Sequence, residues 1–465
     1  MAVESPKTRG RPIETDRVIA PGQTYAGVDD VVNKPVLKGP FATPIWWFIG
    51  FGIAFTLLMV YLYSITTLII RGTGIWGNNV PVAWGFPIIN FVWWIGIGHA
   101  GTLISAILLL FRQDWRTSIN RFAEAMTLFA VACAGLYPIL HLGRPWVFYW
   151  LAPYPNTYGL FPQFRSPLDW DLFAISTYAS VSLLFWYIGL VPDLATVRDK
   201  ASNSFMRVFY GTLALGWRGS AKHWQRYQRA YLLLGALSTP LVLSVHSTIA
   251  MDFAVAQMPG WNNTIAPPYF VAGAVYAGFA MVLLLAIPLR YVFGLQGLIT
   301  KKHLDNCGKV MLATGLIVCY GYMIEVFIAW YSGAEAEQYM IVNRMFGEYG
   351  WAFWALIFCN FVCIQPLWSK RIRNSQTALF IISLIVSVGM WLERYVIIAI
   401  SLTRDWLPSS WDVYNPTVWD WSLYIGSFGL FLTLFFLFIR LLPSIATSEI
   451  KELVHEDAHS EEGAH

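Results

Sequence analysis

Residues 268–293 read PYFVAGAVYAGFAMVLLLAIPLRYVF and contain a single charged side chain, Arg290. About 20 consecutive, mostly apolar residues are enough for an α-helix to cross the hydrocarbon core of a membrane. This stretch is longer than that, so it predicts a transmembrane helix.

Nine other stretches have the same character. The ten expected spans are residues 42–70, 82–111, 122–142, 169–192, 230–257, 268–293, 308–331, 348–368, 376–402 and 419–442. We expect an all-α fold in which helices 2–5 and 6–9 form two four-helix bundles, flanked by helices 1 and 10. Residues 1–41 are expected to be an extended N-terminal arm, residues 42–442 the membrane domain, and residues 443–465 a charged tail, of which residues 455–465 are expected to be disordered.

The composition of the whole chain supports a membrane protein. Of its 465 residues 57% are hydrophobic and only 12% are charged, whereas roughly a quarter of the residues of a soluble domain are charged. The net charge of +4 is small and the basic residues are scattered, which argues against a nucleic-acid partner. The five cysteines form no CxxC pair and are read as packing residues, with Cys359 and Cys363 as an alternative ligand pair.

Basic residues also predict the orientation, because loops rich in Lys and Arg stay on the cytoplasmic side. Of the 31 Lys and Arg residues, 25 lie in the N-terminal arm, in the connections after helices 2, 4, 6 and 8 counted with the adjoining helix ends, and in the C-terminal part of the chain from Arg440. Six lie on the other side. Both termini are therefore expected in the cytoplasm, and the first transmembrane helix serves as an uncleaved targeting element because no cleavable signal peptide precedes it.

Ionisable side chains at membrane depth are costly and usually serve function. With the predicted topology, six of them gather near the outer ends of four helices: His141, Asp169, Asp171, Asp252, Glu393 and Arg394. This clustering predicts a polar pocket at the outer interface. Asp169 and Asp171 point in nearly opposite directions on a helix, and we expect Asp171 to face the pocket and Asp169 to cap the helix. Alternatively, Glu393 and Arg394 form a structural ion pair, and His141 is an ordinary interface histidine.

A second set of polar residues is expected deeper in the membrane. It comprises His99, Thr102 and Ser105 on helix 2, His246 on helix 5, and Tyr322 and Glu325 on helix 7. His246 lies about 9 Å deeper than Asp252 at 1.5 Å per residue. These groups are candidates for a proton path through ordered waters, or else they are hydrogen-bonded between packed helices.

A histidine and a carboxylate at a membrane surface suit quinol oxidation, which releases two protons and two electrons. His141 and Asp171 are the expected proton acceptors. The expected quinol-binding residues are Asp252, Arg394, Asp169 and Glu393. Histidine titrates near neutrality, and a carboxylate in an apolar pocket gains proton affinity. The chain has no CxxCH haem-attachment motif and no cluster-binding cysteine set, so no haem or iron–sulfur cluster is expected in it. The electrons would then pass to another subunit at the outer face, where the aromatic loop 143–168 offers a docking platform.

Four segments carry a family resemblance: HLGRPW at 141–146, SPLDWD at 166–171, HSTIAMDFA at 246–254 and WLERY at 391–395. They resemble the NrfD-like, polysulfide-reductase-type membrane subunits, and the whole chain looks most like the ActC type from bacterial alternative complex III.

The resemblance implies a menaquinol-type substrate, a site at His141, Asp171, Asp252 and Arg394, and location in the bacterial inner membrane. It implies iron–sulfur and c-type haem subunits, a homologous NrfD-like subunit and a terminal oxidase as partners, and proton translocation. Two alternatives are a quinone-reactive anchor of a polysulfide- or nitrite-reductase-type complex and a secondary transporter.

Overall fold

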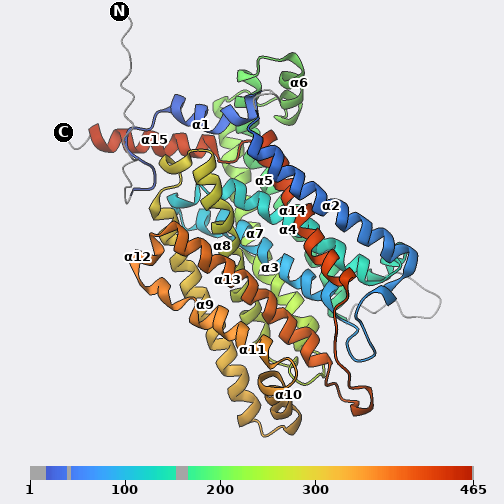
Figure 1. The fold of residues 1–465 in the computed structure, drawn as a ribbon. Coiled ribbons are helices and arrows are strands. Elements are labelled where there is room, and N and C mark those ends of the chain that lie inside the picture. Colours follow the sequence, from blue (N-terminus) through green and yellow to red (C-terminus); the bar gives the residue numbers. More distant parts are fainter. Residues whose placement is uncertain (1–16, 39–42, 153–165, 463–465) are drawn as a thin grey trace, which may run out of the picture.

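The computed structural model describes residues 17–38, 43–152 and 166–462, and the regular secondary structure of these ranges is entirely helical. Ten of the helical segments are long and apolar enough to cross a membrane (Figure 1). The prediction of an all-α protein with ten spans is therefore confirmed, and the chain is a multi-pass integral membrane protein.

Eight of the ten spans are unbroken α-helices. They are α2 (Ile45–Arg71), α3 (Phe86–Leu110), α4 (Asn120–His141), α5 (Pro167–Lys200), α7 (Ala221–Ala254), α8 (Ala266–Val292), α9 (Lys301–Tyr331) and α14 (Val418–Leu441). The other two contain a π-helical turn, a feature that is frequent at functional sites. α11 (Gly350–Ile357) continues into the turn η7 (Phe358–Val362), and α13 (Gln376–Tyr395) continues into η9 (Val396–Ile400).

Shorter helices connect or cover the spans. They are α1 (Tyr25–Leu37), α6 (Ser204–Leu213), α10 (Glu335–Phe346), α12 (Lys370–Arg373) and α15 (Thr447–Glu462). Figure 1 shows α1, α6 and α15 at one end of the molecule and α10 at the opposite end. We call these ends the α1/α15 face and the α10 face. In the predicted topology the α1/α15 face is cytoplasmic and the α10 face is the outer side.

Three boundaries differ clearly from the prediction. α5 extends to Lys200 instead of ending near residue 192, α7 begins at Ala221 instead of near residue 230, and α9 begins at Lys301 instead of near residue 308. Apolarity marks only the part of a helix that lies in hydrocarbon, whereas backbone hydrogen bonding continues into water. The start of α7 is fixed locally, because the Ser220 side chain accepts a hydrogen bond from the His223 amide.

The expectations of an extended arm and of disorder in residues 455–465 were wrong for the described residues. Both regions contain a helix, α1 and α15, and these two helices pack together at the same face (Figure 1). Lys451 of α15 pairs with Asp29 of α1 at 2.8 Å, and Glu449 pairs with Arg116 at 2.9 Å. Contacts with the rest of the protein hold both helices in place, and the local composition did not reveal these contacts.

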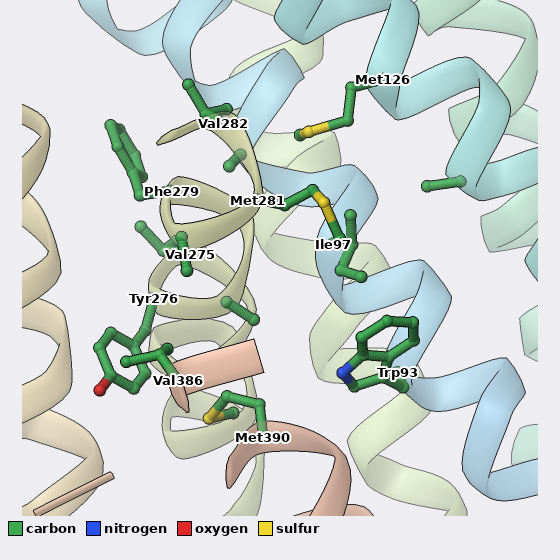
Figure 2. Close-up of a cluster of buried hydrophobic side chains, with 14 of the residues drawn as sticks. Trp93, Ile97, Met126, Val275, Tyr276, Phe279, Met281, Val282, Val386 and Met390 are labelled. Carbon is green, nitrogen blue, oxygen red and sulfur yellow. The ribbon is translucent and has the colours of Figure 1, made fainter. Parts of the chain in front are cut away.

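The centre of the protein is built from α3, α8 and α13. Figure 2 shows side chains of these helices interdigitating, among them Trp93, Tyr276 and Met390. The Trp93 indole donates to the Ser387 carbonyl at 3.2 Å, which ties α3 to α13. α3 contacts α4, α7 and α8 extensively, so it touches both of the predicted four-helix bundles. That grouping stays a prediction.

Candidate functional site

A cavity of about 520 Å³ lies toward the α10 face. Its walls come from α3, α4, α5, α7 and the short helical segment η4 (Pro145–Leu151), and most of its lining side chains are aliphatic or aromatic. Among the described lining residues two are ionisable, Asp171 and Asp252. An apolar cavity with a few converging polar groups is the usual form of a small-molecule site.

The cavity opens toward the lipid-facing surface. Phe148, Leu168 and Leu183 line it, yet they are 54%, 44% and 51% exposed. The lining on α5 extends from Leu168 to Leu183, which corresponds to about 22 Å along the helix axis. The space is therefore an elongated groove between α4 and α5 that starts near the two aspartates and continues toward the middle of the membrane.

Asp171 and Asp252 approach each other from different helices. Asp171 lies in the second turn of α5 and is 6% exposed, and Asp252 lies near the end of α7 and is half-buried. Their carboxyl groups lie close enough to interact electrostatically. The Oδ1 atom of each is buried and has no hydrogen-bond partner among the described residues. Two neighbouring carboxyl groups favour sharing one proton, and the described protein leaves one oxygen of each unsatisfied.

Asp169, two residues before Asp171, and His141, at the end of α4, do not line the cavity. Ser166 occupies the N-cap position of α5, so Asp169 is not the cap that we expected, although it lies in the acidic first turn. Asp169 is 7% exposed, and its Oδ2 has no partner in the described part of the chain. His141 ends α4, is half-buried, and its Nδ1 is likewise without a described partner.

The turn after His141 is shaped by glycine. Gly143 has φ of +70°, a conformation that side-chain-bearing residues rarely adopt. A Cβ at this position would also lie 2.6 Å from the Thr73 side chain. Gly143 thus allows the chain to reverse from α4 into η4, whose Phe148 and Leu151 line the cavity.

Glu393 and Arg394 form a second, separate cluster. Both are almost fully buried, and Arg394 Nη1 lies 2.8 Å from Glu393 Oε1. The Tyr322 hydroxyl donates to Glu393, and Asn360 Nδ2 donates to the Tyr322 oxygen at 2.8 Å. The six residues expected in one pocket therefore occupy at least two places.

Arg394 does not reach the cavity described above. Its guanidinium carbon lies 4.1 Å from the centre of the Phe270 ring, and Phe270 packs against Phe253 with ring centres 5.8 Å apart. Of Arg394, Phe270 and Phe253, only Phe253 lines the cavity. Aromatic side chains thus separate Arg394 from the two aspartates in this conformation.

His99 and His246 meet in the interior. Both are fully buried, and their ring centres are 4.4 Å apart. His99 Nδ1 lies 2.8 Å from the Ile95 carbonyl, and His99 Nε2 lies 2.9 Å from the Val242 carbonyl. A neutral imidazole has one N–H, so only a protonated ring donates to both carbonyls. Neither ring nitrogen of His246 has a partner among the described residues.

Thr102 continues this polar track toward the α1/α15 face. Its hydroxyl lies 3.1 Å from Tyr178 Oη and 3.2 Å from Ser182 Oγ, and Tyr178 donates to the Gly98 carbonyl. Ser105, one turn further along α3, is fully buried and lies close to Glu124. Tyr178 and Ser182 were not singled out from the sequence, because single hydroxyl residues in an apolar helix carry no distinguishing signal.

Three buried charged residues were also missed: Arg121, Glu124 and Asp193. Arg121 Nη2 lies 3.2 Å from Asp193 Oδ2, and Arg121 Nη1 lies 3.6 Å from Glu124 Oε2. Their side chains are at most 3% exposed. Arg121 and Glu124 are three residues apart at the start of a helix, and this spacing could have predicted an ion pair on one helix face. Sequence reasoning treated Arg121 only as a loop charge.

Glu325 has a different environment from the other candidates for a proton path. Arg344 of α10 donates to Glu325 Oε1 at 2.6 Å and also to the Gly260 carbonyl and the Ser401 hydroxyl. Glu325 therefore helps to hold α10 against the membrane helices. Its helical neighbour Tyr322 belongs to the Glu393 cluster instead.

Comparisons with known proteins agree with this architecture. The sequence profile of the family described as polysulphide reductase, NrfD, matches residues 75–404. The chain is 23% identical to a subunit of the selenate reductase of Mesobacillus selenatarsenatis over 78% of this chain and 86% of that protein.

Two other relatives carry a quinone or quinol in their names. One is the Hdr-like menaquinol oxidoreductase integral membrane subunit of Archaeoglobus fulgidus, 21% identical over 88% of this chain and 98% of that protein. The other is the menaquinone reductase integral membrane subunit of Nitratidesulfovibrio vulgaris, 23% identical over 83% of this chain and 89% of that protein. Because the family match covers far more than half of the sequence, the chain belongs to the NrfD polysulphide reductase family of membrane proteins.

Proposed function

We propose that this protein is the quinol-oxidising membrane subunit of a respiratory oxidoreductase, with menaquinol or a similar quinol as its substrate. The observation that carries the proposal is the lipid-facing apolar groove that ends at the paired carboxyl groups of Asp171 and Asp252. A quinol has an aromatic head with two hydroxyl groups and a long apolar tail, and the groove matches this combination. The names of two relatives, a menaquinol oxidoreductase subunit and a menaquinone reductase subunit, support the same substrate class.

The chemistry follows from the arrangement of the two acids. Oxidation of one quinol to a quinone releases two protons and two electrons. The carboxyl pair accepts a hydroxyl proton through a free oxygen, and it acts as a general base in an environment that excludes most water. His141, at the end of the neighbouring helix, is the proposed acceptor for the second proton. The electrons pass to a one-electron acceptor on another subunit, which we place at the α10 face.

Proton translocation is a further part of the proposal. The polar residues His246, His99, Thr102 and Ser105 lead from the region of Asp252 toward Glu124, Arg121 and Asp193 near the α1/α15 face. A histidine ring donates one hydrogen bond when neutral and two when protonated, so it can take up a proton on one side and release it on the other. Tyr322 and Glu393 extend polar contacts into the second half of the protein.

Alternative complex III is the assembly that we propose for this subunit. Its partners would be iron–sulfur and c-type haem subunits and a terminal oxidase. The sequence resemblance supports this part of the proposal.

A quinone-reactive anchor of a polysulfide- or nitrite-reductase-type complex remains the second candidate. The selenate reductase relative favours it, because that protein's name places it in a reductase. In both functions this subunit oxidises quinol, because a polysulfide or nitrite reductase also needs an electron donor. The two functions differ in the acceptor that finally receives the electrons. Quinol-dependent reduction of a terminal oxidase by the intact complex would support the first, and quinol-dependent reduction of polysulfide or nitrite would support the second.

Photoaffinity labelling tests the site itself. The intact complex is illuminated with an azido-quinone that carries an isoprenoid tail, and labelled peptides are identified by mass spectrometry. We expect label on α4 and α5 between residues 128 and 183, and protection by unlabelled quinone. Label confined to the Glu393 cluster, or labelling that excess quinone does not prevent, would contradict the assignment.

A further inference from the structure

A second cavity lies at the α1/α15 face. Its volume is about 380 Å³, and it is bounded by α1, the start of α2, and the ends of α8 and α14. The lining includes three basic residues, Lys34, Lys38 and Arg440. Asp30 is the single acidic residue among the described residues of the wall, so the cavity carries an excess of positive charge.

Nothing in the described chain compensates this excess. Arg440 is partly buried, and it donates to Thr43 Oγ1 at 2.9 Å and to the carbonyls of Pro35 and Lys38 at 2.8 and 2.6 Å. These acceptors are all neutral. Lys34 and Lys38 are exposed and make no ion pair with the described residues. A cavity with an excess of positive charge attracts an anion from outside the described chain.

The cavity also lies at a membrane interface. Trp46 and Trp47 line it, and tryptophan is typical of the boundary between headgroups and hydrocarbon. Directly next to it, Ile45, Ile49 and Ile53 form a stripe along α2 and are 73%, 58% and 59% exposed. Residues spaced by four lie on one side of a helix. A charged pocket thus continues into an apolar, lipid-facing stripe.

We propose that this cavity binds the phosphate headgroup of an anionic phospholipid, whose acyl chains lie along the exposed stripe of α2. Basic pockets between transmembrane helices at one membrane surface are typical sites for such headgroups. The Arg440 guanidinium binds the end of α1 and Thr43, while Lys34 and Lys38 provide the charge that faces the headgroup. The inference does not depend on quinol chemistry, because it uses none of the residues of the first cavity.

The test measures lipid binding to the intact complex in nanodiscs. Phosphatidylglycerol is titrated into nanodiscs of phosphatidylcholine, and native mass spectrometry counts the retained lipids and gives an apparent Kd. The variant Lys34→Gln/Lys38→Gln keeps side-chain length and leaves the structural Arg440 in place. Each lysine near a membrane surface contributes about fivefold, so the double variant should bind about 30-fold more weakly.

The matched control is Lys222→Gln/Arg226→Gln. It removes the same charge from the start of α7, where neither side chain lines the cavity. Retained binding in the control together with loss in the Lys34/Lys38 variant would support the proposal. Equal loss in both variants would mean general surface attraction and would overturn it, as would equal affinity for phosphatidylcholine. Competition by free glycerol phosphate at the same concentration would show a soluble phosphate site and would also overturn it.

Discussion

Replacing either member of the carboxyl pair by its amide tests the proposed chemistry most directly. Asp171→Asn and Asp252→Asn preserve the size of the side chain, and an asparagine can still donate a hydrogen bond to the remaining carboxyl group. The cavity should therefore keep its shape. What disappears is the ability to accept a proton from the quinol hydroxyl.

The expected size of the effect follows from this loss. A positioned general base contributes about 10²–10⁴-fold to a rate, which corresponds to about 2.7–5.5 kcal/mol of activation free energy. Each single variant should lose kcat by an amount in that range, with a smaller change in KM. Because the two carboxyl groups are proposed to act as a unit, the double variant should be hardly slower than the slower single variant.

Turnover would be measured in assembled complexes with a soluble quinol and an artificial electron acceptor, and the amount of each subunit would be checked on the same samples. Asp169→Asn is the matched control, because Asp169 is as well buried as Asp171 but does not line the cavity. Its turnover should stay within a few-fold of the parent protein. Near-normal turnover in both pair variants, or equal losses in the control, would refute the assignment of this pair.

Three further predictions concern other parts of the protein. A Cβ on Gly135 meets no atom within 4 Å, so Gly135→Leu should fill part of the groove without unfolding α4. The variant should raise KM for a long-tailed quinol by about 10-fold. An equal rise in KM for a tailless quinol would argue against a groove that binds the tail. Glu325→Gln should lower the thermal stability of the protein, because Arg344 loses its carboxylate partner, but should leave kcat unchanged; a large loss of turnover at normal stability would instead favour a proton-path role. A reporter fused after His465 should be cytoplasmic, whereas one inserted near Asn156 should be exported, and finding both on one side would contradict the topology.

The sequence alone was sufficient for the membrane architecture. Each span can be recognised locally, because a helix in hydrocarbon must be apolar over about 20 residues whatever its neighbours are. The stretch 268–293 became α8, Ala266–Val292, almost without change. The family resemblance also rested on short linear segments, and the family match confirms it.

The terminal segments depended on contacts between distant parts of the chain. The sequence of α15 looks like a solvated tail, and its helix is held by pairs such as Lys451 with Asp29 and Glu449 with Arg116. These partners are hundreds of residues apart in sequence. No local pattern reports such contacts.

The composition of the candidate site was likewise decided by tertiary structure. The sequence placed Asp171, Asp252, Glu393 and Arg394 at similar depth, because residue number along a helix measures depth. It could not say which way each helix is rotated or which helices are neighbours. Packing of α5 against α7 brings Asp171 to Asp252 in one cavity, while packing around α8 and α9 encloses Glu393 and Arg394 elsewhere. Depth in the membrane is a property of sequence position, but proximity within a layer is set by how the helices pack.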